Sequence, residues 1–457
     1  MNKQILVGLA IFTTAISLLA QDQNSGAEPA MVDDQRAPVP ALLSGDASSL
    51  AFTSELERSN YLRGGITVGA TYDDNATNTV TNPVGAFSYS VLPNISLDQT
   101  RSRMHWTMSY AAGFVANQHV PDRNQASHDF NGSLDLRLSP HVDLHLDDAF
   151  VKTTGFLQQF RDSAITPVTG PINQPNSTVI TPLADGLTNT ASANLTYQFS
   201  AGNVIGGAGT FYDSHFSDAA PGSPSLMDTT SRAGNVFFNH RFNPKNWTGI
   251  TYKFQDLSFA PGNSNSRTHS FLLSHTIYLQ PRMTLSMYVG PEYTELDLQT
   301  VTFVMTLPVV SLATVSSFEH HWSVSGGGNF GWQGERTSLR LEANRRVTDG
   351  GGLQGAVILN SVGGSVRRQL SRSATADFSA TYGHNRALGL IATGQPPLTS
   401  VQGTVGLEQR LAQSLLLRLD YGRDYQEGST FTPTGGSINH NRGSVSLSYS
   451  FTRPLGR

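Results

Sequence analysis

Two histidines and two aspartates alternate over a short stretch of the chain, at His141, Asp143, His145 and Asp147. Imidazole and carboxylate groups are common ligands of transition metals. In an extended strand all four project to one face, and residues two apart lie about 6.6 Å from each other. At most two of them could bind one ion, with help from another strand. The spacing therefore favours polar residues of a sheet wall, and we expect no metal site.

Four other histidines could act as general bases beside the abundant serines and aspartates: His320, His321, His384 and His440. With 13 histidines in the chain, closeness of some to a serine is expected by chance. No Gly-x-Ser-x-Gly motif occurs in a strand-turn-helix context. We therefore expect no enzyme, no catalytic residues and no cofactor, and a hydrolase is the least favoured alternative.

The elements that must position such residues are predicted strands in which apolar and polar residues alternate strictly. Leu415, Leu417 and Leu419 alternate with Arg418 and Asp420, and the segments 130–138 and 337–347 behave in the same way. Side chains of a strand point to opposite faces in turn, so each segment has one apolar and one polar face. A helix would need apolar residues at a spacing of three and four, which no stretch after residue 60 sustains.

The lengths of the segments and of the joints between them distinguish a membrane barrel from a soluble sandwich. Segments such as 103–117, 282–297 and 354–370 exceed the usual strand of about five or six residues, and a tilted membrane-spanning strand needs about 9–11. The joints alternate short and long without exception, as do the periplasmic turns and extracellular loops of outer-membrane barrels. We predict an all-β fold, a transmembrane antiparallel up-and-down β-barrel of about eighteen strands, with sixteen as the alternative.

Composition agrees with a barrel and excludes several other classes. The chain is 38% hydrophobic with a mean hydropathy of -0.23, whereas a helical membrane protein would be far more apolar. In the strands of a membrane barrel apolar residues alternate with polar ones, so the mean hydropathy of the chain stays low. The formal net charge is -4, and there is no phosphate-binding loop, dinucleotide fingerprint or basic patch, so we expect no nucleic-acid partner.

The chain divides into three predicted parts. Residues 1–20 form a secretory signal peptide, with Lys3 before the apolar run Ile5–Leu19 and the small residue Ala20 at its end. Residues 21–60 form a flexible periplasmic segment, and residues 61–457 form the barrel. The chain has no cysteine, so barrel closure rather than a disulfide would stabilise the exported protein. An even number of strands would leave both termini in the periplasm of a Gram-negative cell.

Short motifs at both ends of the barrel segment resemble the family of outer-membrane β-barrel porins. They are the signal peptide, Tyr72-Asp73-Asp74-Asn75 at the end of the first strand, and the tail Phe451–Arg457. The resemblance would cover residues 61–457 and implies a barrel in the outer membrane. Some members of the family accompany exopolysaccharide export, and it carries over no catalytic residue. The final strand, with Phe451 near its end, also resembles the signal read by the barrel assembly machinery.

A barrel of this size encloses an aqueous channel, so its inward charges would set selectivity. The candidates that line the lumen are Asp129, Asp135, Arg137, Asp143, His145, Asp147, Arg340, Glu342, Arg346, Arg367, Asp377, Glu408, Arg410, Arg418 and Asp420. Neighbouring strands carry opposite signs, which favours pairing along the wall over strong ion selectivity. We predict a channel for saccharides or an exported polysaccharide. The alternative is a structural or adhesion barrel with a blocked lumen and partner-binding loops.

Two long joints stand out. The joint 153–187 includes a Pro-, Thr- and Asn-rich stretch at 165–185, and an exposed loop is favoured over one that folds inward to constrict the pore. The joint 298–316 is unusually apolar, but Pro308 and its short length argue against a transmembrane helix. We expect it to form a β-hairpin that extends the barrel wall. The oligomeric state and the transported solute are not predicted.

Overall fold

The computed structural model describes residues 60–80, 82–118, 124–154, 176–181, 184–217, 226–261, 264–306, 309–389, 397–428 and 436–455. The predicted signal peptide and the predicted flexible segment, except its last residue, lie outside these ranges. The described strands are β1 (Asn60–Asp73), β2 (Ala86–Arg101), β3 (Met104–Asn117), β4 (Gln125–Ser139), β5 (Val142–Thr154), β6 (Asp185–Ser200), β7 (Asn203–Ser217), β8 (Asp228–Asn243), β9 (Asn246–Ala260), β10 (Ser264–Gln280), β11 (Met283–Thr306), β12 (Val309–Gln333), β13 (Thr337–Gly350), β14 (Gln354–Gln369), β15 (Ala374–Ala387), β16 (Leu398–Ala412), β17 (Leu415–Gly428) and β18 (Gly436–Pro454).

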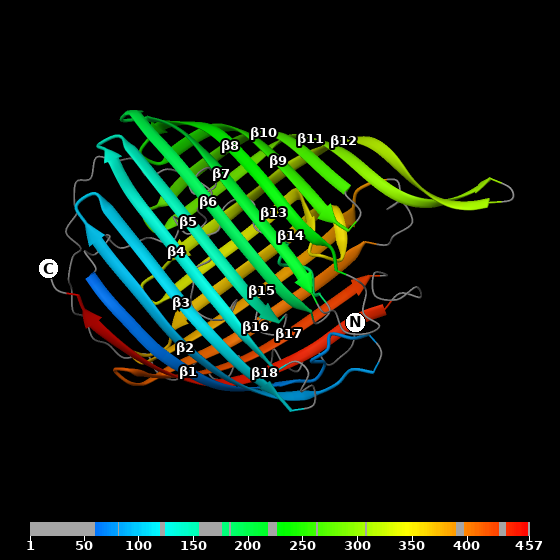
Figure 1. Cartoon of the computed structure of the whole chain (residues 1–457). Coiled ribbons are helices and arrows are strands. Elements are labelled where there is room, and N and C mark those ends of the chain that lie inside the picture. The colour runs from blue at the N-terminus through cyan, green and yellow to red at the C-terminus, as the bar shows by residue number, and fades with distance from the viewer. Residues whose placement is uncertain are drawn as a thin grey trace, which may run out of the picture. The chain divides into compact units, whose positions relative to one another are not determined.

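The strands form one closed antiparallel barrel of 18 strands, in which each strand pairs with its neighbours in sequence (Figure 1). Closure is made by β1 and β18, whose ladder runs from Tyr61–Pro454 to Asp73–Arg442. The start of β1 and the end of β18 therefore lie on the same side of the barrel, together with short turns such as Arg101 to Met104. The prediction of eighteen strands is confirmed, and the alternative of sixteen is wrong.

The two faces of the wall differ in chemistry. On β17, Leu419 and Tyr421 are exposed on the outer face, whereas Arg418 and Asp424 are buried on the inner face. The same division holds on β9, where Ile250 is 60% exposed. Exposed apolar side chains circle the barrel, and a continuous apolar surface of this kind is stable against lipid rather than water. In the part of the chain that the structure describes, no helix is long and apolar enough to span a membrane.

Aromatic side chains occupy one level of the outer face, as outward-running strands predict. Tyr72, Tyr382 and Tyr421 are exposed there, and Tyr293 packs against Trp322 with ring centroids 4.9 Å apart. Tyr212 is an exception, because it is buried on the inner face while its neighbour Phe211 is exposed on the outer one. Successive residues of a strand point to opposite faces, so the position of a residue in this alternation decides whether its side chain faces outward, whatever its type.

In the apolar joint, residues 298–306 and 309–316 are strand, as the hairpin hypothesis expects. β11 and β12 pair continuously from Met283–Trp332 to Thr306–Val309, and in Figure 1 their ends extend together beyond the barrel. β11 and β12 are therefore 24 and 25 residues long, longer than the predicted strands. The cross-strand hydrogen bonds satisfy backbone groups that an irregular loop would leave unpaired.

Candidate channel and its inner wall

A carboxylate–imidazole network runs across the inner face of β2 to β5. His105 Nε2 lies 3.1 Å from Asp98 Oδ1, and its Nδ1 lies 3.4 Å from Asp135 Oδ2. His145 then connects Asp135, at 2.5 Å, to Asp147, at 2.6 Å. Residues that face each other on adjacent strands lie close together, so side chains that are distant in the sequence can pair along the wall. The network binds four strands together and offers acids and imidazoles to the lumen.

Arg418 is the centre of a second network on β15 to β17. Its guanidinium donates to both carboxylate oxygens of Asp377, at 3.1 and 3.2 Å, and its Nε donates to Asp420 Oδ2 at 3.1 Å. Glu408 lies 3.7 Å from Nη1 and 3.9 Å from Arg367. The Arg418 side chain is only 9% exposed, so the cation is enclosed by its acids. Charges of both signs are thus paired along this part of the wall.

The remaining predicted lumen residues lie on the inner face of β4, β5, β13 and β16 but are less closely connected. Arg137 and Asp143 are 4.0 Å apart, and Asp129 accepts a hydrogen bond from Asn131. The inner face of β13 carries three more candidates and that of β16 one: Arg340, Glu342, Arg346 and Arg410. Their place on the inner face follows from alternation with exposed Leu341 and Leu407. Their role in lining a conducting channel remains a proposal.

The alternating His and Asp residues do not all lie on one strand. His141 lies in the turn before β5, whereas Asp143, His145 and Asp147 lie on β5. Among the described residues, no group of three or more His, Cys, Asp or Glu side chains is placed to hold a metal ion. Both ring nitrogens of His145 already face carboxylates.

The histidines considered for a hydrolase do not gather at one site. His320 Nδ1 lies 3.0 Å from the hydroxyl of Tyr293 on the outer face, and His384 contacts Thr399. His440 is buried on the inner face between Asp424, at 2.8 Å, and Asp73, at 3.2 Å. Both of its ring nitrogens therefore face carboxylates, and it joins β1, β17 and β18 across the closure of the barrel.

The hairpin of β13 and β14 reaches across the inside of the barrel. At its tip, residues 347–350 and 356–359 are buried on both faces. The backbone N–H of Met227 donates to the carbonyl of Gly352 at 2.7 Å, which joins the tip to the segment before β8. A wall hairpin would keep one face outward, so burial of both faces shows that the tip lies within the barrel opening.

Residues 176–181 pack against this tip instead of forming an exposed loop. The Asn176 side chain donates to the carbonyl of Asp349 at 3.0 Å and to Asn385 Oδ1 at 2.6 Å. Ile180 exchanges hydrogen bonds with the Gln426 side chain, at 2.7 and 2.8 Å. The preference for an exposed loop is therefore wrong for this part of the joint 153–187, and the inward alternative holds, because polar inner-wall groups satisfy its backbone. Residues 155–175 lie outside the described ranges.

Sequence reasoning missed two buried charged residues on the inner faces of β9 and β11, Lys253 and Glu292. Lys253 on β9 is buried on the inner face, and Glu292 on β11 accepts hydrogen bonds from Ser270, at 3.2 Å, and Ser323, at 3.0 Å. Each is next to an aromatic residue that faces outward. Because successive side chains of a strand point to opposite faces, the sequence could have assigned both to the inner face. The extent of their burial could not be predicted from alternation, because alternation assigns a face of the strand but not what packs against it.

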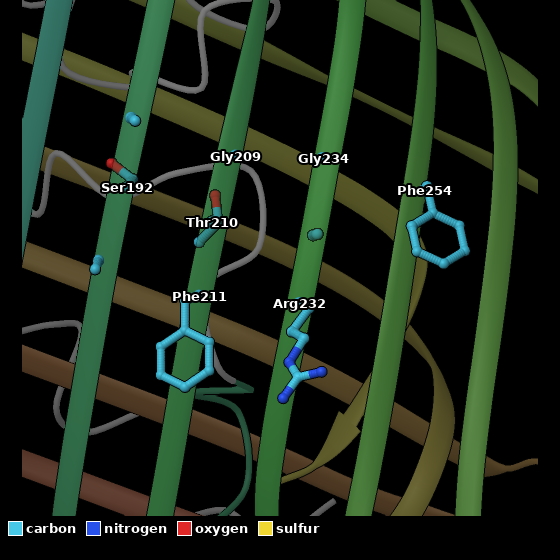
Figure 2. Close-up of a pocket in the computed structure, with 10 residues that line it drawn as sticks. Ser192, Gly209, Thr210, Phe211, Arg232, Gly234 and Phe254 are labelled. Carbon is cyan, nitrogen blue, oxygen red and sulfur yellow. The ribbon is translucent and has the colours of Figure 1, made fainter.

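The outer face carries a separate groove of about 580 Å³ across β6 to β9. Figure 2 shows Gly209 and Phe211 on β7, Gly234 and Arg232 on the neighbouring β8, and the ring of Phe254 on β9. The groove exists because glycines and alanines replace the larger apolar residues of the surrounding wall. Since it lies on the outer face, it is not part of the lumen.

No family model and no curated protein matches the chain. Solved structures with similar folds include OccK2 (OpdF) of Pseudomonas aeruginosa, with a TM-score of 0.44 and 11% identity over 86% of this chain and 98% of that chain. A BenF-like porin from Pseudomonas fluorescens Pf-5 gives a TM-score of 0.43 and 11% identity over 86% and 99%. OccAB4 of Acinetobacter baumannii gives 0.41 and 11% over 88% and 100%. The eighteen-strand closure itself follows from the strand pairing of this chain.

Proposed function

We propose that the chain is an outer-membrane channel for small polar solutes, narrowed by the β13–β14 tip. The observation that carries this proposal is a closed barrel of 18 strands with an apolar outer face and a polar inner one. Barrels of 16–18 strands enclose an aqueous channel. Lipid of the outer membrane is then the outer partner, and the barrel assembly machinery would insert the chain.

The inner wall favours an uncharged solute rich in hydroxyl groups. The acids around Arg418 and around the two histidines are paired, so the wall has no long stretch of one sign. Serine and threonine side chains alternate along the inner faces of β10 and β11, where most are buried and some pair with each other, as Thr268 does with Thr294. The half-exposed carboxylates of Asp135 and Asp143 can accept hydrogen bonds from the hydroxyl groups of a saccharide, and the paired charges around them favour no ion. The export of a polysaccharide rests on the family resemblance alone.

The proposed orientation places both chain ends in the periplasm. The start of β1 pairs with the end of β18, and the turns at that end of the barrel are short. Short turns are periplasmic and longer loops extracellular in outer-membrane barrels. The β13–β14 tip and residues 176–181 then close the extracellular mouth.

Planar-bilayer recording and liposome swelling with the refolded full-length chain test this function. We expect stepwise conductance with little preference between cations and anions, and faster swelling in arabinose than in stachyose. A folded protein that neither conducts nor admits arabinose would contradict an open channel. Swelling in stachyose as fast as in arabinose would contradict a narrowed one.

The buried tip also supports a second function, an adhesion barrel with a blocked lumen. Residues 347–350 have no exposed face, and Asn176 fixes the tip to β15. Replacing residues 349–355 with a short glycine turn distinguishes the two functions. A narrowed channel conducts with its native tip and conducts more when the tip is shortened, whereas a barrel blocked by the tip conducts only after the tip is shortened.

A further inference from the structure

The barrel wall is interrupted where β13 bends inward. The ladder between β12 and β13 runs only from Gln333–Ser338 to Gly326–Arg345. On its other edge β12 continues to pair with β11 as far as Val309. Among the described strands, the edge of β12 above Gly326 therefore has no partner on the β13 side. An unpaired sheet edge is unfavourable unless its polar backbone groups are satisfied.

Side chains complete the last rung at this interruption. Arg345 Nε donates to the carbonyl of Val324 at 3.1 Å, and its Nη1 donates to Asn360 Oδ1 at 2.8 Å. Ser325 Oγ donates to the Arg345 carbonyl at 3.2 Å. Just above, Trp322 is 70% exposed on the outer face, at the level of the aromatic side chains. The interruption therefore begins at the boundary of the apolar band.

An apolar pocket lies inside the barrel beside this interruption. Leu257, Phe259 and Leu296 face inward and pack against Ala356 of the bent hairpin. On the same inner faces they follow polar residues, Gln255 on β9 and Thr294 on β11. A methyl group built at Gly389 would lie 2.6 Å from Leu298 Cδ1 and 3.8 Å from Glu319 Oε2, so this pocket wall adjoins β12.

The pocket contains a buried hydroxyl without a partner. Ser266 is 1% exposed, lines the pocket, and its Oγ makes no hydrogen bond. A buried polar group left without a hydrogen-bond partner is energetically unfavourable. Ser264, Asn265 and Gln354 also line the pocket, and none of its lining residues is charged. These groups suit a ligand with one hydroxyl or carbonyl and no charge.

The size of the pocket limits the apolar part of that ligand. Its volume is about 220 Å³. A dry cavity of roughly 150 Å³ lined by aliphatic and aromatic side chains is known to hold benzene. The pocket therefore accepts one six-membered ring with a short substituent, or a short alkyl chain.

We propose that this pocket binds an uncharged amphiphile, a ring or short alkyl chain with a hydroxyl group, that reaches it from the membrane through the interruption between β12 and β13. The inference rests on the membrane location of the proposed function but not on conduction. Leu296 and Phe259 would hold the apolar part, and Ser266 would exchange a hydrogen bond with the hydroxyl. An apolar compound dissolved in the leaflet would then reach the lumen without crossing open water.

Binding is tested with benzyl alcohol on the full-length chain in lipid nanodiscs, by saturation-transfer NMR against empty nanodiscs. We expect Ser266→Ala to weaken binding roughly tenfold, the loss of one hydrogen bond to a buried group. Ala356→Phe should fill the pocket and abolish binding. Ser274→Ala is the matched control, because Ser274 is buried on the same face of β10 outside the pocket. No binding by the native chain, or equal binding by the Ala356→Phe variant, overturns the proposal.

The route is tested with a fluorophore on a single cysteine, since the chain has none of its own. A label at Leu298→Cys should be quenched by phospholipids with brominated acyl chains, and a label at Ser379→Cys on the inner wall should be quenched by iodide only. Quenching of both labels by iodide alone overturns access from the membrane. A chain that conducts but does not bind benzyl alcohol contradicts only this inference, and one that binds it but never conducts contradicts only the channel.

Discussion

Replacing Arg418 with methionine should destabilise the barrel by about 3 kcal/mol. The substitution keeps an unbranched side chain of similar length but removes a cation that contacts Asp377, Glu408 and Asp420. Breaking a buried ion pair by removing one partner is unfavourable by about 3–5 kcal/mol, because the other charge stays buried. The three acids are 29%, 16% and 17% exposed. Partial solvation from the lumen therefore places the effect near the lower end of that range.

Arg367→Met is the matched control, because Arg367 is 57% exposed and lies 3.9 Å from Glu408. An exposed ion pair contributes about 0–1 kcal/mol. Urea unfolding in lipid vesicles, followed by tryptophan fluorescence, measures both variants. The Arg418→Met channel should also prefer cations in reversal-potential measurements, since three acids then face the lumen without their arginine. If both variants unfold at the same urea concentration as the native chain, the enclosed network does not stabilise the wall in the way described.

Three further predictions follow from individual contacts. Asn176→Ala removes the side-chain hydrogen bonds that hold the β13–β14 tip, so single-channel conductance should rise, and an unchanged value would show that this segment does not hold the tip. Gly290→Ala should impair folding, measured as loss of heat-modifiable gel mobility, because its methyl group would overlap the Phe271 carbonyl; Gly443→Ala, where the space is open, should fold normally. His440→Ala leaves two buried carboxylates facing each other and should lower stability to urea by about 3 kcal/mol, and a loss below about 1 kcal/mol would contradict a bridging role.

Much of the barrel could be predicted from the sequence because the period of two is a local property of the backbone. Each strand such as β17 assigns Leu419 outward and Arg418 inward without knowledge of any other strand. The alternation of short and long joints then gives the order of strands, because antiparallel neighbours are joined directly. Alternation also placed the predicted charges on the inner face.

The partners of those charges needed the register between strands. His145 lies between Asp135 on β4 and Asp147 on its own strand, and the same Asp135 also faces His105 on β3. A shift of two residues in one ladder would keep every face the same and change every partner. The sequence alone therefore predicted pairing along the wall but not which pairs form.

Amino-acid alternation by itself determined the strands, the two faces and the barrel class. Only the tertiary structure decided that the β13–β14 tip bends inward, that residues 176–181 cover it, and that the wall is interrupted beside an apolar pocket. The hydrogen bonds that fix this arrangement join residues separated by 173, 209 and 246 positions in the chain. Side-chain direction in a strand depends on the adjacent peptide units, whereas contacts across the lumen exist only after eighteen strands have closed.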